Sequence, residues 1–302
     1  MTDAFALNIA GVNIKLSLDA ELGSPASTLS PFLSPGDSPQ PPALAVEVLR
    51  QDEVLTPALP DSSATMSVHP HDGGLAFYRP GGTLVSSPDF SFCRVHVLAD
   101  RPPPEPFDGR PWLLLALWGH VAHRGGALLH GAVCELEGHF VVFLGKPGAG
   151  KSTLGELVVA AGGTCLTDEY PVLTWREERA WAHGTPWRGI CGPGMRLSGP
   201  LEGVFFLRHA PANELERLGQ PEGGRRLLQN ARFFVWQPDT IPQTVELLDR
   251  TARSVPIYDF GFVPEASAVE CLREALRPAS SPGLAAAFPA PHPPAAEAEQ
   301  QD

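Results

Sequence analysis

Hydrophobic and polar residues alternate with a period of two near the start of the chain. Over residues 5–18 the apolar positions of this alternation include Val12, Ile14, Leu16 and Leu18. Such a pattern predicts a half-buried β-strand. Further short strands are predicted at 43–49, 75–79 and 90–98, separated by turn-forming Pro, Gly, Asp and Ser. We therefore expect residues 1–107 to form a β-rich N-terminal portion, and Pro102-Pro103-Pro104 marks the break after it.

The pattern changes after this break. Residues 111–124 carry apolar side chains at helical spacing and predict a helix. The run Phe140–Leu144 is continuously apolar, as in a strand buried on both faces. Further elements are expected as strands at 127–134, 164–167, 171–175 and 203–208, and as helices at 151–161 and 225–233. Residues 278–302 are rich in Ala and Pro without aliphatic periodicity, which predicts a disordered tail.

Length and charge narrow the class of protein. The chain has 302 residues, enough for one large domain or two modest ones, and a formal net charge of −12. No run of Lys and Arg occurs in it. This balance argues against a nucleic acid or an anionic membrane as the main partner. A nucleotide remains compatible, because it needs only a local positive pocket.

The cysteines and the apolar segments indicate in which cellular compartment the protein is expected. The five cysteines form no Cys-x-x-Cys pair, and we expect them to be free thiols in a reducing environment: Cys93, Cys134, Cys165, Cys191 and Cys271. No signal peptide is recognisable, and the most apolar stretch, 112–121, is too short to span a bilayer, which needs about 20 residues. These features predict a cytoplasmic protein.

One stretch carries a specific chemical signal. Residues 145–153 read Gly-Lys-Pro-Gly-Ala-Gly-Lys-Ser-Thr, a complete Walker A pattern between a predicted strand and a predicted helix. Its members, and the expected cofactor-binding residues, are Gly145, Lys146, Pro147, Gly148, Ala149, Gly150, Lys151, Ser152 and Thr153. Backbone N–H groups would surround phosphate oxygens, Lys151 would neutralise the β- and γ-phosphates, and the Ser152 hydroxyl would coordinate Mg²⁺.

Two further positions add to this signal. Asp168 and Glu169 end a predicted strand 17 residues after Lys151. An acidic side chain there can hold Mg²⁺ or its water, or accept a proton from a nucleophile. His130 follows Leu128-Leu129. Taken alone it is more typical of a structural histidine in the core or on the surface.

Together these residues resemble a known family. The segment 128–132 (Leu-Leu-His-Gly-Ala), the loop 145–153 and Thr167-Asp168-Glu169 occur in the order and spacing of the HPr kinase/phosphorylase catalytic domain. The closer likeness is to the HPr kinase-related proteins encoded beside peptide-modification genes. The segments 184–187 and 203–208 also resemble that group, and the likeness covers roughly residues 110–240.

The resemblance implies a phosphoenolpyruvate-carboxykinase-like α/β fold, with a P-loop domain over residues 108–277 and the β-rich portion before it. It implies transfer of a phosphoryl group from ATP, or from pyrophosphate, to a hydroxyl, with Mg²⁺ as cofactor. By position, Asp168 would be the catalytic base and Glu169 the second acidic residue near the metal. His130 would lie beside the transferred phosphate, and the protein would form a homo-oligomer.

The chain also departs from the family. The Glu-x-Arg-Gly signature of bacterial HPr kinases has Trp187-Arg188-Gly189 as its best counterpart here, without the Glu, and Glu169 replaces a usual Asp. Both departures argue against HPr as the acceptor and against phosphorolysis. They favour a serine-type kinase acting on another protein or peptide hydroxyl.

Three functions remain open at this point. The first is this kinase, with Lys151, Asp168 and His130 as catalytic residues and Ser152, Asp168 and Glu169 around the metal. The second is a nucleotide-switched ATPase that regulates a partner without phosphorylating it. A GTPase is less favoured, because no Asn-Lys-x-Asp segment is present. The third is a non-catalytic scaffold, which the complete Gly-Lys-Ser sequence opposes.

Residues 225–236 allow two interpretations. They combine basic and aromatic residues: Arg225, Arg226, Arg232, Phe233, Phe234 and Trp236. The simpler interpretation is a partly buried helix with a solvated basic edge. The alternative is a contact surface for nucleotide phosphates or for an acidic acceptor.

Overall fold

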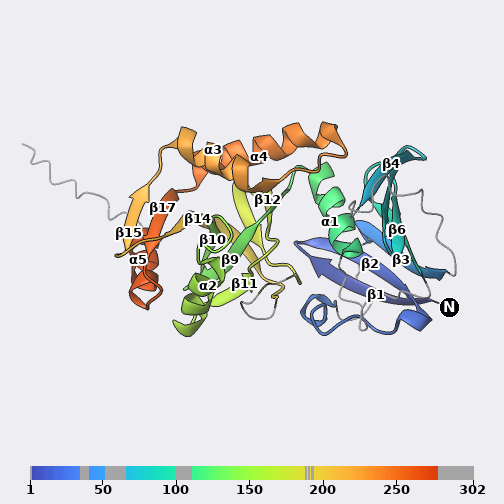
Figure 1. Cartoon of the computed structure of the whole chain (residues 1–302), viewed down its shortest axis with the longest axis horizontal. Helices are drawn as coiled ribbons and strands as arrows, with labels where there is room; N and C mark the ends of the chain where they lie inside the picture. The colour runs from blue at the N-terminus through green and yellow to red at the C-terminus, as the bar shows by residue number, and fades with distance from the viewer. Residues whose placement is uncertain are drawn as a thin grey trace, which may run out of the picture.

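Two β-sheets organise the chain, with helix α1 (Trp112–His123) between them (Figure 1). The computed structural model describes residues 2–34, 41–51, 66–98, 111–187, 189, 191 and 194–277. Over these residues the protein is a mixture of sheets and helices, and the expected α/β class is confirmed at this level. No helix in the described ranges has the length and apolar character needed to cross a membrane.

The first sheet contains seven strands in the order β1-β2-β3-β7-β6-β5-β4. Their bounds are β1 (Thr2–Ile9), β2 (Val12–Asp19), β3 (Leu44–Gln51), β4 (Ser67–His71), β5 (Gly74–Arg79), β6 (Gly82–Ser86) and β7 (Phe92–Leu98). The strands predicted at 43–49, 75–79 and 90–98 are confirmed as β3, β5 and β7. Two 3-10 helices follow β2, η1 (Ala20–Leu22) and η2 (Ser30–Phe32).

The single strand predicted over residues 5–18 is wrong, because this segment is an antiparallel hairpin of β1 and β2. Ala10 and Gly11 have φ angles of 54° and 74°, which reverse the chain in a tight turn. The buried positions therefore shift from odd numbers (Leu7, Ile9) to even numbers (Ile14 onward) across the turn. This switch of the buried positions from odd to even numbers is the sequence signal of the hairpin.

The second sheet takes the rest of the strands. Its main path is β11-β9-β10-β14-β13-β12-β8-β16, and β17 joins β14 and β15 beside it. The bounds are β8 (Ala127–Leu129), β9 (Gly131–Leu136), β10 (His139–Leu144), β11 (Thr164–Thr167), β12 (Val172–Arg176), β13 (Arg179–His183), β14 (Ser198–His209), β15 (Glu214–Arg217), β16 (Ala231–Arg232) and β17 (Ile257–Phe262). Strand β10 is buried over Val141–Leu144, as its apolar run predicts.

The strand predicted over 127–134 is divided at His130 into β8 and β9. Strand β8 pairs with β12 and β16, whereas β9 pairs with β10 and β11. The chain thus changes pairing partners at His130. An apolar run cannot show such a change, because both strands are buried.

Helices cover both faces of the second sheet (Figure 1). On one face α2 (Lys151–Ala160) and α5 (Ser267–Leu276) pack together, and on the other α3 (Gln220–Asn230), the 3-10 helix η3 (Pro238–Thr240) and α4 (Ile241–Ser254) lie side by side. The helix predicted at 225–233 is α3, which begins at Gln220. It ends at Asn230 because Ala231 and Arg232 pair with β8 as strand β16.

One apolar core extends beyond the first sheet. It includes Leu113 and Leu117 of α1, and also Trp187 and Phe234 from the second half of the chain. The boundary expected between residues 107 and 108 lies outside the described residues, as does the tail 278–302. All five cysteines are free thiols, as expected, and four of them are buried.

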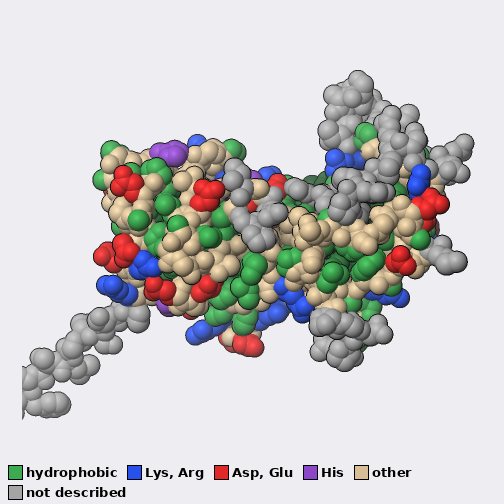
Figure 2. Space-filling model, turned by 90° about the horizontal axis from the view of Figure 1, so that it is seen from below, with side chains coloured by type: hydrophobic (Ala, Val, Ile, Leu, Met, Phe, Trp, Pro, Cys, Tyr) green, Lys and Arg blue, Asp and Glu red, His purple; other side chains and the backbone are tan. Residues whose placement is uncertain are grey.

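Acidic and basic side chains lie interspersed on the face shown in Figure 2. This arrangement agrees with the absence of a Lys/Arg run in the sequence.

Helix α1 is attached to the first sheet by a buried histidine. His120 is fully buried, and its Nδ1 lies 2.8 Å from the carbonyl oxygen of Phe90, so Nδ1 donates. Its Nε2 has no hydrogen-bond partner among the described residues. Burial lowers the pKa of His120 to about 4, with the charges of Arg124 and His123 acting in the same direction, although the Phe90 carbonyl opposes the shift.

This histidine predicts an acid-sensitive fold. In the unfolded chain a histidine has a pKa of about 6.5, so the unfolded state binds the proton first as the pH falls. The stability from neutral His120 is complete above about pH 6.5 and is lost as the pH falls toward 4. Between pH 7.5 and 5 we expect this residue to remove about 2 kcal/mol from the free energy of unfolding. Urea unfolding of the wild-type protein and of His120→Gln at both pH values measures it. An equal pH dependence in the two proteins would contradict this assignment.

Candidate functional site

A glycine-rich loop connects β10 to α2. Gly145, Gly148 and Gly150 have φ angles of 147°, 80° and 95°, a region that L side chains rarely adopt. A Cβ on Gly150 would lie 2.6 Å from Cζ of Phe262, and one on Gly145 would lie 3.0 Å from the carbonyl oxygen of Leu207. Both ends of the loop therefore require glycine for backbone conformation and for space.

Lys151 opens helix α2 and points back over the loop. Its Nζ donates to the carbonyl oxygens of Gly145 (2.9 Å) and Lys146 (3.2 Å). The residue is 8% exposed, and burial lowers its pKa. Around it, the first N–H groups of α2 have no partner within the helix, which makes this end attractive to anions. Ser152 is half-buried and Thr153 is exposed in the same turn.

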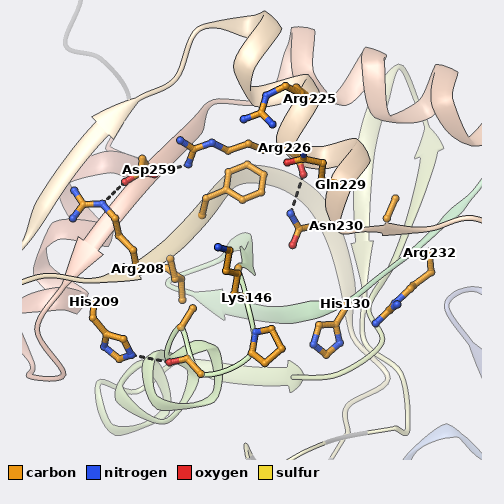
Figure 3. Close-up of a pocket in the computed structure, with 17 residues that line it drawn as sticks. His130, Lys146, Arg208, His209, Arg225, Arg226, Gln229, Asn230, Arg232 and Asp259 are labelled. Carbon is orange, nitrogen blue, oxygen red and sulfur yellow. Dashed lines mark hydrogen bonds and ion pairs between the residues drawn. The ribbon is translucent and has the colours of Figure 1, made fainter.

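A cavity of about 860 Å³ lies against this loop (Figure 3). Its walls come from the loop, from the last residues of β14, from β17, from the end of α3 and from the turn between β8 and β9. The residues that line it are His130, Gly145, Lys146, Pro147, Gly148, Ala149, Phe206, Leu207, Arg208, His209, Arg225, Arg226, Gln229, Asn230, Ala231, Arg232 and Asp259. Four arginines, one lysine and two histidines thus meet in one space, in a chain of net charge −12.

Three of these arginines belong to an ion-pair network. Asp259 accepts hydrogen bonds from Arg208 (2.6 Å) and Arg226 (2.5 Å). Arg208 also bonds Glu214, and Arg225 and Arg226 both bond Glu222. Burial alone would raise the pKa of Asp259, but the bonds from Arg226 and Arg208 hold it below its usual value. Three arginines and three carboxylates make this wall nearly neutral and fix its geometry.

His130 lies at the opposite side of the cavity. Its backbone N–H donates to the carbonyl oxygen of Asn230 (3.2 Å), and its ring Nδ1 is buried with no partner among the described residues. Burial lowers the pKa of His130, and the positive charges of Lys151 and Arg232 lower it further, against the opposing effect of the Glu169 backbone. Burial and these charges thus favour the neutral form of the ring, which lines the cavity with its buried Nδ1 unpaired among the described residues.

Asp168 is placed differently. It is 5% exposed and does not line the cavity. Its Oδ1 accepts the N–H of Gly189 (2.6 Å) and its Oδ2 accepts that of Cys191 (3.0 Å). The carboxylate thus holds the segment that follows Trp187, where Arg188 lies outside the described residues. Glu169 is half-buried next to it, and its carbonyl oxygen faces the N–H of Gly131 at 3.4 Å.

Of the residues expected from the sequence, the structure brings His130 and Gly145–Ala149 to one cavity, with Lys151 directly behind the loop. Sequence reasoning did not identify Arg208, His209 and Asp259. Arg208 and His209 close the apolar run of β14, and a charged residue at the end of an apolar strand was the available signal. His209 Nε2 lies 2.7 Å from the carbonyl oxygen of Gly148, so it supports the loop.

Comparisons with known proteins give a likeness to solved structures only. No family model matches the chain, and no curated protein matches it. Among solved structures, the chain is similar to the HPr(Ser) kinase/phosphatase from Coxiella burnetii. The two share 13% sequence identity over 49% of this chain and 93% of that chain, with a TM-score of 0.29.

The loop geometry predicts a contrast between two glycines. Gly150→Ala combines the cost of a left-handed backbone with a clash against Phe262, and we expect a loss of about 2–4 kcal/mol in the free energy of unfolding. Gly148→Ala has the same kind of backbone (φ 80°) but meets open space, so a loss of about 1 kcal/mol is expected. Urea unfolding of both variants measures the difference. Equal losses would mean that Phe262 does not limit the loop.

The contacts of Asp168 predict a structural effect of its removal. Asp168→Asn replaces one accepting oxygen by an NH₂ group, which faces a backbone N–H and cannot accept from it. We expect a loss of about 1–3 kcal/mol in stability. Faster amide hydrogen exchange at Gly189 and Cys191 should accompany it, with Glu169→Gln as the control. Unchanged exchange at both amides would contradict this role.

Proposed function

We propose that the protein is an ATP-dependent kinase that transfers a phosphoryl group to a serine-type hydroxyl of a protein or peptide. The observation that carries this proposal is the conformation of loop 145–150. Its glycines have positive φ angles, the Lys151 ammonium donates to the loop carbonyls at the start of α2, and residues 145–149 line a cavity. Such an arrangement suits the phosphates of a nucleotide.

The protein offers few ligands for Mg²⁺ among the described residues, which suits a Mg²⁺ ion held mainly by the nucleotide phosphates. Among the described residues no cluster of three or more His, Cys, Asp or Glu side chains could hold an ion. Mg²⁺ usually binds through one or two protein oxygens together with waters and substrate phosphates. We assign the Ser152 hydroxyl, in the first turn of α2, as the main protein ligand, with Asp168 and Glu169 acting in the surrounding shell. When bound, Mg²⁺ neutralises charge on the transferred phosphate.

In the proposed reaction the acceptor oxygen bonds to the γ-phosphorus. The bond from that phosphorus to the bridging oxygen breaks, and its electron pair leaves with ADP. Following the family resemblance, the hydroxyl proton moves to the carboxylate of Asp168, which in this structure accepts the N–H groups of Gly189 and Cys191 and does not line the cavity. In this proposal Lys151 stabilises negative charge on the phosphates, and His130, which lines the cavity, lies beside them.

A nucleotide-switched ATPase is the alternative. The loop supports it equally, because nucleotide binding is common to both functions. The acidic pair Asp168-Glu169 after β11 favours the kinase, because a switch does not need a base for an acceptor hydroxyl.

Lys151→Ala provides the main test. We expect it to lower ATP affinity and phosphoryl transfer by at least tenfold, because a charge-assisted contact to phosphate contributes about 1.5–3 kcal/mol. The measurement is transfer of label from γ-labelled ATP to serine-containing peptides and to cell-extract proteins, followed by mass spectrometry. Lys15→Ala, an exposed lysine of β2, is the matched control. Labelled phosphate released to water with no labelled acceptor would favour the ATPase and overturn the kinase.

A further inference from the structure

The chain between α3 and η3 connects the cavity to the first sheet. We call residues 230–237 the bridge segment. Asn230, Ala231 and Arg232 line the cavity, whereas Phe234 lies in the apolar core of the first sheet and Trp236 packs against that core. The two ends of the segment therefore lie in different parts of the molecule.

The backbone of the bridge segment is held from the second sheet. Ala231 and Arg232 pair with Leu129 and Leu128 of β8, directly before His130. The His130 N–H adds a bond to the carbonyl oxygen of Asn230. The position of Arg232 is therefore coupled to that of His130.

The first sheet and α1 hold the segment from the other side. Trp118 of α1 donates its Nε1–H to the carbonyl oxygen of Arg232 at 3.1 Å. The Phe234 ring is buried edge-to-face against Trp118 (5.3 Å between centroids) and Phe90 (5.1 Å). Such aromatic pairs add about 0.5–1.5 kcal/mol each beyond their buried area.

The end of the bridge segment is also anchored. Gln237 lies 2.6 Å from Nε2 of His123 through its Oε1, and its Nε2 donates to the carbonyl oxygen of Pro88 (3.0 Å). The segment is thus fixed to α1 and to the loop before β7.

Arg232 differs from the other arginines of the cavity. Arg208, Arg225 and Arg226 are paired with carboxylates, whereas Arg232 has no ion pair within the described part of the chain. Its guanidinium points toward His130 (Figure 3). The positive charges of Arg232 and Lys151 both lower the pKa of His130, so both charges act on this one side chain of the cavity.

We propose that Arg232 contacts the phosphates of the nucleotide bound at loop 145–150, and that Trp118 is the positioning residue that holds it there. This inference rests on the proposed nucleotide site. It makes α1 and the first sheet part of the binding apparatus, since Trp118 of α1 donates to the Arg232 carbonyl and Phe77 of β5 packs against Phe234. A planar guanidinium is suited to phosphate oxygens through paired hydrogen bonds.

Calorimetric titration of ATP into the full-length protein tests the inference. We expect Arg232→Gln to weaken ATP binding about tenfold or more, as for loss of a charge-assisted hydrogen bond. Arg253→Gln, an exposed arginine of α4 that pairs with Asp249 outside the cavity, should leave affinity within about twofold, as expected for a surface substitution. Both variants remove one positive charge, so the control separates a contact from a general charge effect.

Trp118→Phe keeps an aromatic ring but removes the Nε1–H donor, and we expect it to weaken ATP binding about three- to tenfold. Trp236→Phe is the matched control, because Trp236 packs in the same aromatic cluster and has no side-chain hydrogen bond to the bridge segment among the described residues. If Trp118 acts through Arg232, then Trp118→Phe should have almost no effect on affinity in the Arg232→Gln background. Thermal unfolding of each variant separates loss of binding from loss of fold.

The results of these titrations distinguish failure of the roles of Arg232 and Trp118 from failure of the proposed kinase function. If Arg232→Gln binds ATP as the wild type does while Lys151→Ala does not bind, the nucleotide site stands and the role of Arg232 is overturned. Equal effects of Trp118→Phe with and without Arg232 would overturn the positioning role. If the wild-type protein binds no ATP, the proposed function is wrong and this inference is overturned with it.

Discussion

The parallel pairing of β10, β14 and β17 is the constraint on which the cavity depends. In register, Leu144 lies beside Phe206, and Phe206 lies beside Asp259. Because the three strands run in the same direction, their carboxyl ends meet at one edge of the sheet. The loop after Leu144, the residues Arg208 and His209, and the ring of Phe262 therefore come together. Phe262 in turn limits the space at Gly150.

The remaining wall of the cavity depends on the first sheet. The bridge segment is held by β8 on one side and by Trp118, Phe90 and Phe77 on the other. Removing the first sheet together with α1 would expose the Phe234 ring and release the carbonyl of Arg232. The β-rich portion is thus energetically coupled to the site, although it contributes no side chain that lines the cavity.

Local patterns in the sequence were sufficient for a large part of the fold. Alternation identified β3, β5 and β7, and the apolar run with its Gly-rich continuation identified β10 and α2. The hairpin at Ala10-Gly11 was missed, because the turn uses two small residues between otherwise continuous strands. Helix α3 was predicted too short at its start, where Gly223 and Gly224 weaken the helical signal.

The candidate site also combines residues that a local motif predicts with residues that only the fold brings together. The loop residues are contiguous, so their arrangement follows from a local motif. Arg208 and Asp259 are 51 residues apart and meet only through parallel pairing, which no local pattern encodes. The two backbone bonds of Asp168 likewise depend on a later segment folding back onto β11. Sequence reasoning therefore singled out the loop residues and the arginines of 225–232, but it did not predict that Arg208 and Asp259 join them around one cavity.

The cationic side chains around the cavity fall into two groups, those paired with carboxylates and those without such a partner among the described residues. Arg208, Arg225 and Arg226 are matched by Glu214, Glu222 and Asp259, so this network adds rigidity but little net potential. The uncompensated charge comes from Lys146 and Lys151 in the loop and from Arg232 on the bridge segment. In a partly buried site such charges are less screened than at the surface. A protein of net charge −12 can thus attract a polyphosphate at one point, because three cations there lack carboxylate partners among the described residues. Lys146 and Lys151 belong to the Walker A sequence, and Arg232 is held by β8 and by Trp118 of α1.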